Sequence, residues 1–148
     1  MVDAGLDNMP PGWRLDFDEA PSPETRAAFG REINAFHART VPQDSQRFAF
    51  LLRDQAGTID GGVIGVASWT WLFIEALWVG DALRGRGLGR GLIGLAETRG
   101  LQLGCHSAWL DTFQASDFYL AVGYEPFGVL RDYPPGQSRH FMKKALVA

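Results

Sequence analysis

The chain has 148 residues, of which 46% are hydrophobic and 21% charged, and its formal net charge is −3. This length suits a single domain, 1–148, which would bury roughly 70% of the surface that the unfolded chain exposes. The acidic balance argues against a nucleic-acid-binding protein, because such a surface usually shows as a basic patch. Cys105 is the only cysteine, so no intramolecular disulfide can form and nothing requires an oxidising compartment.

The N-terminal stretch, residues 1–13, has neither a basic region nor an apolar run, so we expect no signal peptide. The longest apolar stretch, residues 63–80, is interrupted by polar residues and glycines. This pattern favours two strands over a membrane span. We therefore expect a cytoplasmic protein with neither a membrane nor a nucleic-acid partner.

The first third of the chain predicts one strand and one helix. Residues Trp13 to Phe17 alternate apolar with polar side chains, as an edge strand does. Ser22 and Pro23 are typical of a helix cap and a first helical position, and apolar residues then recur at helical spacing until Pro42. The sequence therefore predicts a helix at 23–40.

Three strands follow, at 48–53, 63–69 and 71–79, with turn residues at 54–57 and 60–62. Their short connections indicate an antiparallel meander. The remaining predicted elements are a helix at 88–103, a strand at 106–111, a short helix at 115–122, and strands at 124–130 and 139–146.

The long helix between the strands at 71–79 and 106–111 predicts that these two strands run parallel in a right-handed crossover. The expected fold class is therefore α/β, with a mixed and mostly antiparallel sheet that contains one parallel βαβ unit and is flanked by helices.

A glycine- and arginine-rich loop stands between the strand that ends at Val79 and the helix that starts at Leu88. Backbone N–H groups at the start of a helix lack partners, and the helix dipole adds positive potential there, so such a loop is a seat for phosphate. Its glycines let a ligand approach the main chain. Its arginines, Arg84, Arg86 and Arg90, supply charge for further phosphate oxygens.

Three phosphate-binding templates compete for this loop. The nucleoside-triphosphate loop requires a lysine after its last glycine, and no lysine follows any glycine here. The dinucleotide fingerprint is matched by Gly89, Gly91 and Gly94, with Asp111 downstream to hold a ribose. Its first glycine should end the strand directly, however, whereas Gly89 lies ten residues past Val79.

The third template is Q/R-x-x-G-x-G/A, which the run from Arg84 to Gly89 matches. Here the chain resembles the GCN5-related N-acetyltransferase (GNAT) superfamily, in which this loop holds the pyrophosphate of acetyl-coenzyme A (acetyl-CoA). The resemblance implies that acetyl-CoA is the co-substrate. It places the following residues at the cofactor: Leu77, Trp78, Val79, Arg84, Gly85, Arg86, Gly87, Leu88, Gly89, Arg90 and Thr112.

Glu75 is the only ionisable residue between Asp60 and Asp81 and lies in a nearly all-apolar strand. A carboxylate in such a strand is expected to be desolvated, which would make it a better base near neutral pH. Exposure at a sheet edge, or pairing with an arginine, would explain Glu75 equally well. In histone-type members of the superfamily, the strand that Glu75 to Val79 resembles carries the general base.

The run from Ala115 to Tyr124 resembles the superfamily's A-x-x-F-Y-x-x-x-G-F/Y motif. The tyrosine at the position of Tyr119 serves there as general acid to the departing thiolate, a role that acyl transfer from a thioester requires. The alternative is that Phe118 and Tyr119 only pack a short helix on the sheet. The histidines and Cys105 show no ligand spacing, so we expect no metal site.

These residues predict an N-acetyltransferase that moves the acetyl group of acetyl-CoA directly to a primary amine of a small molecule or peptide. Two alternatives stay open: a non-catalytic acyl-CoA-binding or regulatory domain and, less well supported, an NAD-dependent reductase. The sequence does not identify the acceptor amine. A homodimer is permitted, since small members of the superfamily often dimerise.

Overall fold

The computed structural model describes residues 6–147. The chain divides into two compact units, Met1–Pro42 and Gln43–Ala148. The sheet and all the predicted site residues belong to the second unit. None of the helices in residues 6–147 has the length and apolar character that crossing a bilayer requires.

The first unit contains a short 3-10 helix, η1 (Leu6–Asn8), and one α-helix, α1 (Pro23–His37). Ser22 caps α1, because its side-chain oxygen accepts a hydrogen bond from the Thr25 backbone N–H at 3.1 Å. The predicted helix is therefore confirmed, although it ends at His37. The edge strand predicted at Trp13 to Phe17 is wrong. Alternation indicates which side chains would share a face, but a strand forms only when its backbone hydrogen-bonds to a neighbouring strand. The described part of this unit contains no strand that could be that neighbour.

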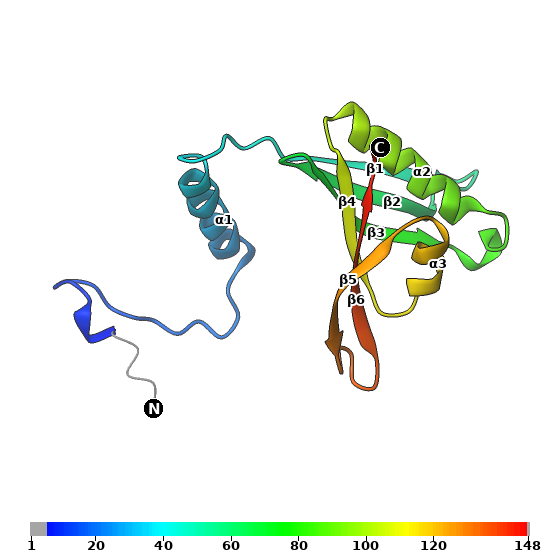
Figure 1. Ribbon diagram of the computed structural model, residues 1–148. Helices are drawn as coiled ribbons and strands as arrows, with labels where there is room; N and C mark the ends of the chain where they lie inside the picture. The colour runs from blue at the N-terminus through cyan, green and yellow to red at the C-terminus, as the bar shows by residue number, and fades with distance from the viewer. Residues whose placement is uncertain (1–5, 148) are drawn as a thin grey trace. The chain divides into compact units, whose positions relative to one another are not determined.

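The second unit is built on a six-stranded sheet in the order β1-β2-β3-β4-β6-β5 (Figure 1). Its strands are β1 (Gln46–Arg53), β2 (Ile59–Ser68), β3 (Trp71–Val79), β4 (Ser107–Thr112), β5 (Glu125–Arg131) and β6 (Ser138–Ala145). Its helices are the 3-10 helix η2 (Asp81–Leu83) and the α-helices α2 (Leu88–Gln102) and α3 (Ser116–Ala121). Strands β3 and β4 are parallel and every other neighbouring pair is antiparallel, which confirms the predicted mixed sheet with one parallel βαβ unit.

The turn predicted at residues 60–62 is wrong, because these residues lie inside β2. Gly62 pairs with Leu51 of β1 and with Trp78 of β3. A Cβ atom at Gly61 would lie 2.9 Å from the Trp78 carbonyl oxygen, closer than real Cβ contacts allow. The two glycines therefore let the neighbouring backbones approach β2, a use of glycine in strands that sequence reasoning confused with a turn.

Helix α2 covers one face of the sheet at β1, β2 and β3 (Figure 1). It approaches closely because Gly100 faces Leu72, whose Cδ2 would lie only 3.0 Å from a Cβ at that position. Leu72 and Ile93 are 0% and 1% exposed, and burial of such side chains contributes roughly 1.5–3 kcal/mol each. This packing fixes the position of the N-terminus of α2, where the glycine loop delivers the chain.

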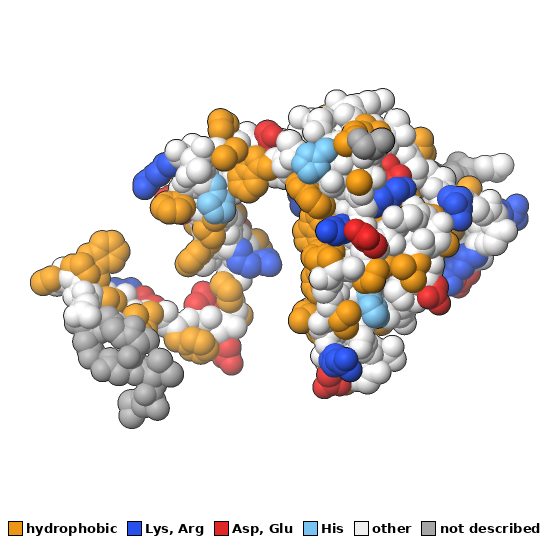
Figure 2. Space-filling model, viewed as in Figure 1, with side chains coloured by type: hydrophobic (Ala, Val, Ile, Leu, Met, Phe, Trp, Pro, Cys, Tyr) orange, Lys and Arg blue, Asp and Glu red, His pale blue; other side chains and the backbone are white. Residues whose placement is uncertain are grey.

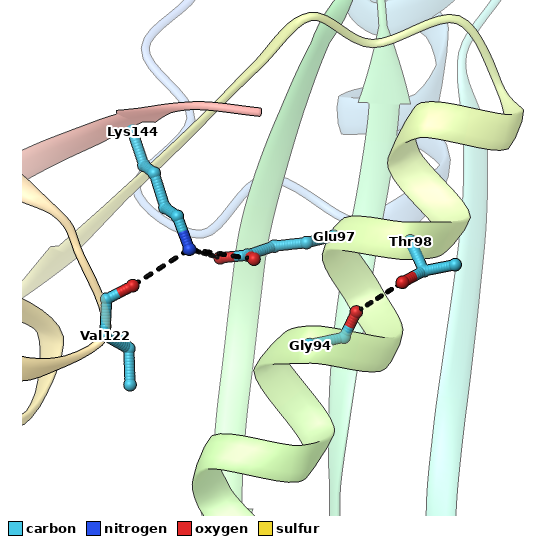
Figure 3. A network of polar contacts seen from close by, with 5 residues as sticks. All are labelled: Gly94, Glu97, Thr98, Val122 and Lys144. Carbon is cyan, nitrogen blue, oxygen red and sulfur yellow. Dashed lines mark hydrogen bonds and ion pairs between the residues drawn. The ribbon is translucent and has the colours of Figure 1, made fainter. Parts of the chain in front are cut away.

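A charged contact ties α2 to the last strand and to the end of α3 (Figure 3). Lys144 Nζ donates hydrogen bonds to both carboxylate oxygens of Glu97 at 2.9 Å and to the Val122 carbonyl oxygen at 2.9 Å. The Glu97 and Lys144 side chains are only 15% and 26% exposed. The half-buried pair therefore holds together the three elements that surround the predicted site.

Candidate active site

The glycine loop connects the end of β3 to the start of α2. At Val79 the strand ends, and the backbone N–H of Gly80 donates to the Asp60 carbonyl oxygen at 2.8 Å. Gly85 and Gly87 then adopt left-handed conformations, with φ of 75° and 76°, which residues with a Cβ rarely adopt. Gly87 is the N-cap of α2. The loop thus needs glycine for its backbone turns, as its sequence indicates.

Among residues 6–147, no side chain caps the N-terminus of α2. Gly87 has no side chain to cap the helix, and the first turn contains no acidic residue. The first backbone N–H groups of an α-helix have no intrahelical acceptor, and the helix dipole makes this end positive. Lys and Arg side chains also gather over this end of the unit (Figure 2). The geometry suits a phosphate group.

A groove lies over this loop and is called here the loop groove. It is lined by Val79, Leu83, Arg84, Gly85, Gly87, Leu88, Gly89, Arg90 and Phe118. Most of the residues predicted to hold the pyrophosphate therefore come together, whereas Arg86 is not part of the lining.

Arg84 is partly committed to the loop itself. Its Nε atom donates to the Val79 carbonyl oxygen at 3.2 Å and lies 3.3 Å from the Asp81 carboxylate. Arg90, in the first turn of α2, makes no such contact among the described residues and remains available to a ligand. The arginines that the sequence presents as equivalent thus differ in what they do.

A second groove lies where β3 and β4 part. The parallel pairing joins Trp71 to Phe73 with Ser107 to Trp109 and then stops, although both strands continue. This split groove is lined by Ile74, Glu75, Ala76, Leu77, Asp111, Thr112, Phe113, Gln114, Ala115, Tyr119 and Arg139. The backbone of β3 beyond Phe73 has no β4 partner, so its polar groups can bind an extended ligand. The split thus leaves one edge of β3 open on the side of β4.

Tyr119 reaches the split groove from α3 and is only 7% exposed. Its ring packs edge-on against those of Phe118 and Tyr124, at centroid distances of 5.0 Å and 5.8 Å. Burial raises the pKa of the Tyr119 hydroxyl above its ordinary value. A phenol in this position stays protonated across the neutral range and can donate its proton.

Glu75 lies at a β-bulge. The register passes from Ile64 opposite Ala76 to Gly65 opposite Ile74, so Glu75 is the extra residue of β3. The buried Ile74 and the exposed Glu75 alternate as neighbours in a strand do, so Glu75 faces away from the side of the sheet that buries Ile74. There Arg47 Nε and Nη2 donate to its two oxygens at 3.0 Å and 3.1 Å. Because 36% of its side chain is exposed, the Glu75 carboxylate remains in contact with solvent. The desolvation expected from its apolar strand is therefore wrong.

Besides Arg86, three of the residues predicted at the cofactor lie outside the loop groove. Leu77 and Thr112 line the split groove. The Thr112 hydroxyl oxygen also accepts the backbone N–H of Ala115 at 3.2 Å, which fixes the start of α3. Trp78 is 51% exposed and lines neither groove, so only its backbone is available for the predicted contact.

Sequence reasoning missed an ion pair in the split groove. Arg139 Nη1 donates to Asp111 Oδ1 at 2.7 Å, and the two side chains are 22% and 27% exposed. The guanidinium carbon lies 4.4 Å from the Tyr133 ring centroid and 5.4 Å from that of Phe113. Asp111 entered the sequence argument only as a ribose ligand in the dinucleotide template. The sequence shows only that Asp111 and Arg139 each lie near the end of a strand. The order of the strands in the sheet is needed to predict that the two side chains meet.

The remaining candidates stay outside both grooves. Cys105 is 3% exposed, and burial, with a smaller effect of Asp44, raises the pKa of its thiol, which suits a core residue better than a nucleophile. Within residues 6–147, no group of three or more His, Cys, Asp or Glu side chains is arranged to hold a metal ion.

Comparison with known proteins gives this geometry a family. Residues 12–124 match the model of the "Acetyltransferase (GNAT) family". A blasticidin-S acetyltransferase from Streptomyces morookaense is 41% identical over 95 residues, which cover 62% of this chain and 70% of that protein. The crystal structure of an acetyltransferase from Bacillus cereus superposes with a TM-score of 0.75 at 28% identity and covers 88% and 97% of the two chains. An aminoglycoside 6'-N-acetyltransferase complexed with coenzyme A shares the fold at 18% identity, with a TM-score of 0.61 over 83% and 87% of the chains.

Proposed function

The chain belongs to the GNAT acetyltransferase family and is an N-acetyltransferase with acetyl-CoA as its co-substrate; from this premise we propose a division of the two grooves. The loop groove holds the pyrophosphate, and the split groove holds the pantetheine arm, the thioester and the acceptor amine. The observation that carries the proposal is the parting of β3 from β4 beside the glycine loop, with Tyr119 inside the opening. The domain that does this is proposed to span residues 1–148; the family match, at 12–124, includes residues of both compact units.

In the proposed reaction, the neutral amine nitrogen attacks the thioester carbonyl carbon. The C–S bond then breaks, the acetyl group stays on nitrogen, and coenzyme A leaves as a thiolate. Tyr119 gives its proton to that thiolate, and the attacking nitrogen loses a proton to Glu75 or to a water molecule that Glu75 holds. Backbone N–H groups at the free edge of β3 polarise the carbonyl oxygen while negative charge develops on it.

We propose a small-molecule amine as the acceptor. The relatives support this choice, since one is described as a blasticidin-S acetyltransferase and another as an aminoglycoside 6'-N-acetyltransferase. The split groove, at about 280 Å³, is also near the lower end of ligand-site volumes. Antibiotics with exposed amines therefore head the panel of candidate acceptors.

Two measurements test this function. Thermal unfolding with acetyl-CoA, coenzyme A, NAD and ATP in parallel should show a raised midpoint with the two coenzyme A forms alone, because only a ligand of the native state stabilises it. Release of the coenzyme A thiol should then be followed with blasticidin S, kanamycin, spermidine, lysine and a short peptide. Tight acetyl-CoA binding without transfer to any of these amines would contradict the proposal and favour a non-catalytic acyl-CoA-binding domain.

The role of Glu75 has its own test. We expect Glu75→Gln to lower kcat on the order of 10²-fold and to change the acidic limb of the pH–rate profile, because a general base must lose its proton before it acts. Arg47→Gln is the companion variant, since it keeps the carboxylate and removes its ion-pair partner. An unchanged profile in Glu75→Gln would assign proton removal to another group.

We also propose that two copies associate, with β5 as the contact. This strand is at one edge of the sheet, and Phe127, Val129 and Leu130 are 53%, 49% and 48% exposed. Edge strands with apolar side chains readily pair with another chain. Light scattering after size exclusion should give twice the chain mass, and Val129→Lys should restore the single-chain mass.

A cytoplasmic location likewise stays a prediction, supported by the single cysteine.

A further inference from the structure

The two carboxylates of the split groove differ in how many hydrogen bonds they accept. Glu75, Asp111 and Arg139 line it, and each of the two carboxylates has an arginine partner. Both oxygens of Glu75 accept hydrogen bonds from Arg47. Asp111 has a single bond, from Arg139 to Oδ1. An ionised carboxylate can accept about four hydrogen bonds. Asp111 therefore keeps most of its capacity, and its Oδ2 makes no hydrogen bond within residues 6–147.

Asp111 is also held firmly. Its partner Arg139 lies against the rings of Tyr133 and Phe113 at 4.4 Å and 5.4 Å, and a guanidinium between two aromatic rings loses its freedom to swing away. Asp111 lies in β4 and pairs with Phe141 of β6. Both members of the ion pair are thus supported by the sheet and by packed rings, which is the usual requirement of a recognition element.

We infer that Asp111 determines acceptor specificity by binding a cationic group of the acceptor other than the reacting amine, and that Arg139 is its positioning residue. The reacting amine must be neutral to attack, and direct contact with a carboxylate would favour its charged form. Asp111 suits a second ammonium or guanidinium group, which it can hold by a charge-assisted hydrogen bond. The acceptor class is therefore a diamine or a larger polyamine-like molecule. This inference rests on the proposed function of the split groove.

Three amines of equal chain length test it: 1,5-diaminopentane, 1-aminopentane and 5-aminopentanoate. We expect kcat/KM for the diamine to exceed that for aminopentane by about tenfold, which is about 1.4 kcal/mol. In Asp111→Asn this preference should disappear, because the KM for the diamine should rise more than the KM for aminopentane. Asp16→Asn is the matched control, since Asp16 forms an exposed ion pair with Arg14 in the first unit.

The Arg139→Gln variant separates positioning from general structure. It should weaken the diamine preference while acetyl-CoA still raises the unfolding temperature, and Arg139→Lys should restore part of the preference. Equal losses for all three amines in Asp111→Asn, a wild-type preference for aminopentanoate, or transfer to none of the three would each overturn the inference. The proposed function is judged separately, by transfer to any amine of the wider panel.

Discussion

Tyr119 holds its hydroxyl proton more firmly than a free tyrosine does, because its ring is buried between α3 and the sheet. Burial of the neutral phenol costs little, whereas burial of a phenolate would be expensive. The same side chain lines the groove in which the thioester is proposed to lie. At the scale of a single residue, Tyr119 can therefore serve both packing and chemistry. Its ring serves the packing, whereas the chemical role depends on the hydroxyl alone.

Tyr119→Phe removes that hydroxyl and keeps the ring. We expect kcat to fall by about 10²–10⁴-fold, the usual contribution of a positioned acid, with the unfolding temperature nearly unchanged. Tyr124→Phe is the matched control, because Tyr124 is also buried, its hydroxyl has no hydrogen-bond partner among the described residues, and it lines neither groove. Steady-state turnover of acetyl-CoA by the two variants decides the matter. Full activity in Tyr119→Phe would remove Tyr119 from the mechanism.

At the scale of elements, the loop and α2 act as one unit, since the loop ends at the helix cap and the helix is fixed by its packing on the sheet. The glycines of this segment differ in whether the backbone requires glycine at their position. Gly87 needs a positive φ of 76°, whereas Gly91 lies in the helix with open space where a Cβ would be. Two substitutions to alanine should therefore act in opposite directions.

We expect Gly87→Ala to destabilise the protein by roughly 1–2 kcal/mol, because a left-handed conformation carries that cost for a residue with a Cβ. It should also raise the KM for acetyl-CoA, since the cap orients the N–H groups of α2. Gly91→Ala should stabilise the protein by up to about 1 kcal/mol, because alanine is the better helix former. Urea unfolding of both variants checks the signs, and a stabilised Gly87→Ala would show that the loop does not require its left-handed turn.

The Glu97–Lys144 pair connects α2 with β6 and α3 (Figure 3). Lys144→Met should lower the free energy of unfolding by on the order of 2–3 kcal/mol, because it leaves a half-buried carboxylate without its hydrogen-bonded partner. Lys143→Met, at the exposed neighbouring position, is the control and should change stability by less than about 0.5 kcal/mol. Equal effects of the two variants would show that the ion pair contributes nothing specific.

At the scale of the whole molecule, the two buried tyrosines predict how stability depends on alkaline pH. Burial, assisted for Tyr124 by the Glu97 carboxylate, raises the pKa of both hydroxyls above the ordinary value of 10.0. Above about pH 10 the unfolded chain loses these protons while the folded protein keeps them, so the folded state binds more protons and its stability falls as pH rises. The stabilisation is complete below pH 10 and is lost at higher pH.

Urea unfolding at pH 8, 9.5 and 11 should therefore show a fall confined to the last interval. The fall should be smaller in the Tyr119→Phe, Tyr124→Phe double variant, which has no buried phenol at these positions. A double variant as sensitive as the wild type would place the alkaline transition elsewhere.

Much of the fold and part of the site followed from the sequence because they depend on local rules. Apolar spacing predicted α2 and the strands that flank it, and Ser22 and Pro23 predicted the start of α1. The run from Arg84 to Gly89 predicted a loop that suits phosphate, since backbone N–H groups and positive φ angles are properties of the local chain. The motif around Tyr119 suggested the acid of the reaction, and that role stays a prediction.

The tertiary structure decided what depends on partners distant in sequence. The apolar strand around Glu75 predicted a desolvated carboxylate, but the folded sheet brings Arg47 of β1 to that carboxylate, and this partner is distant in sequence. The glycines at 61 and 62 lie in a strand because two neighbouring backbones approach them. The pairing of Asp111 with Arg139 required strand β6 to lie beside β4. The sequence by itself determined the loop and the chemistry it suits, whereas the walls of the site arise from contacts that only the folded sheet creates.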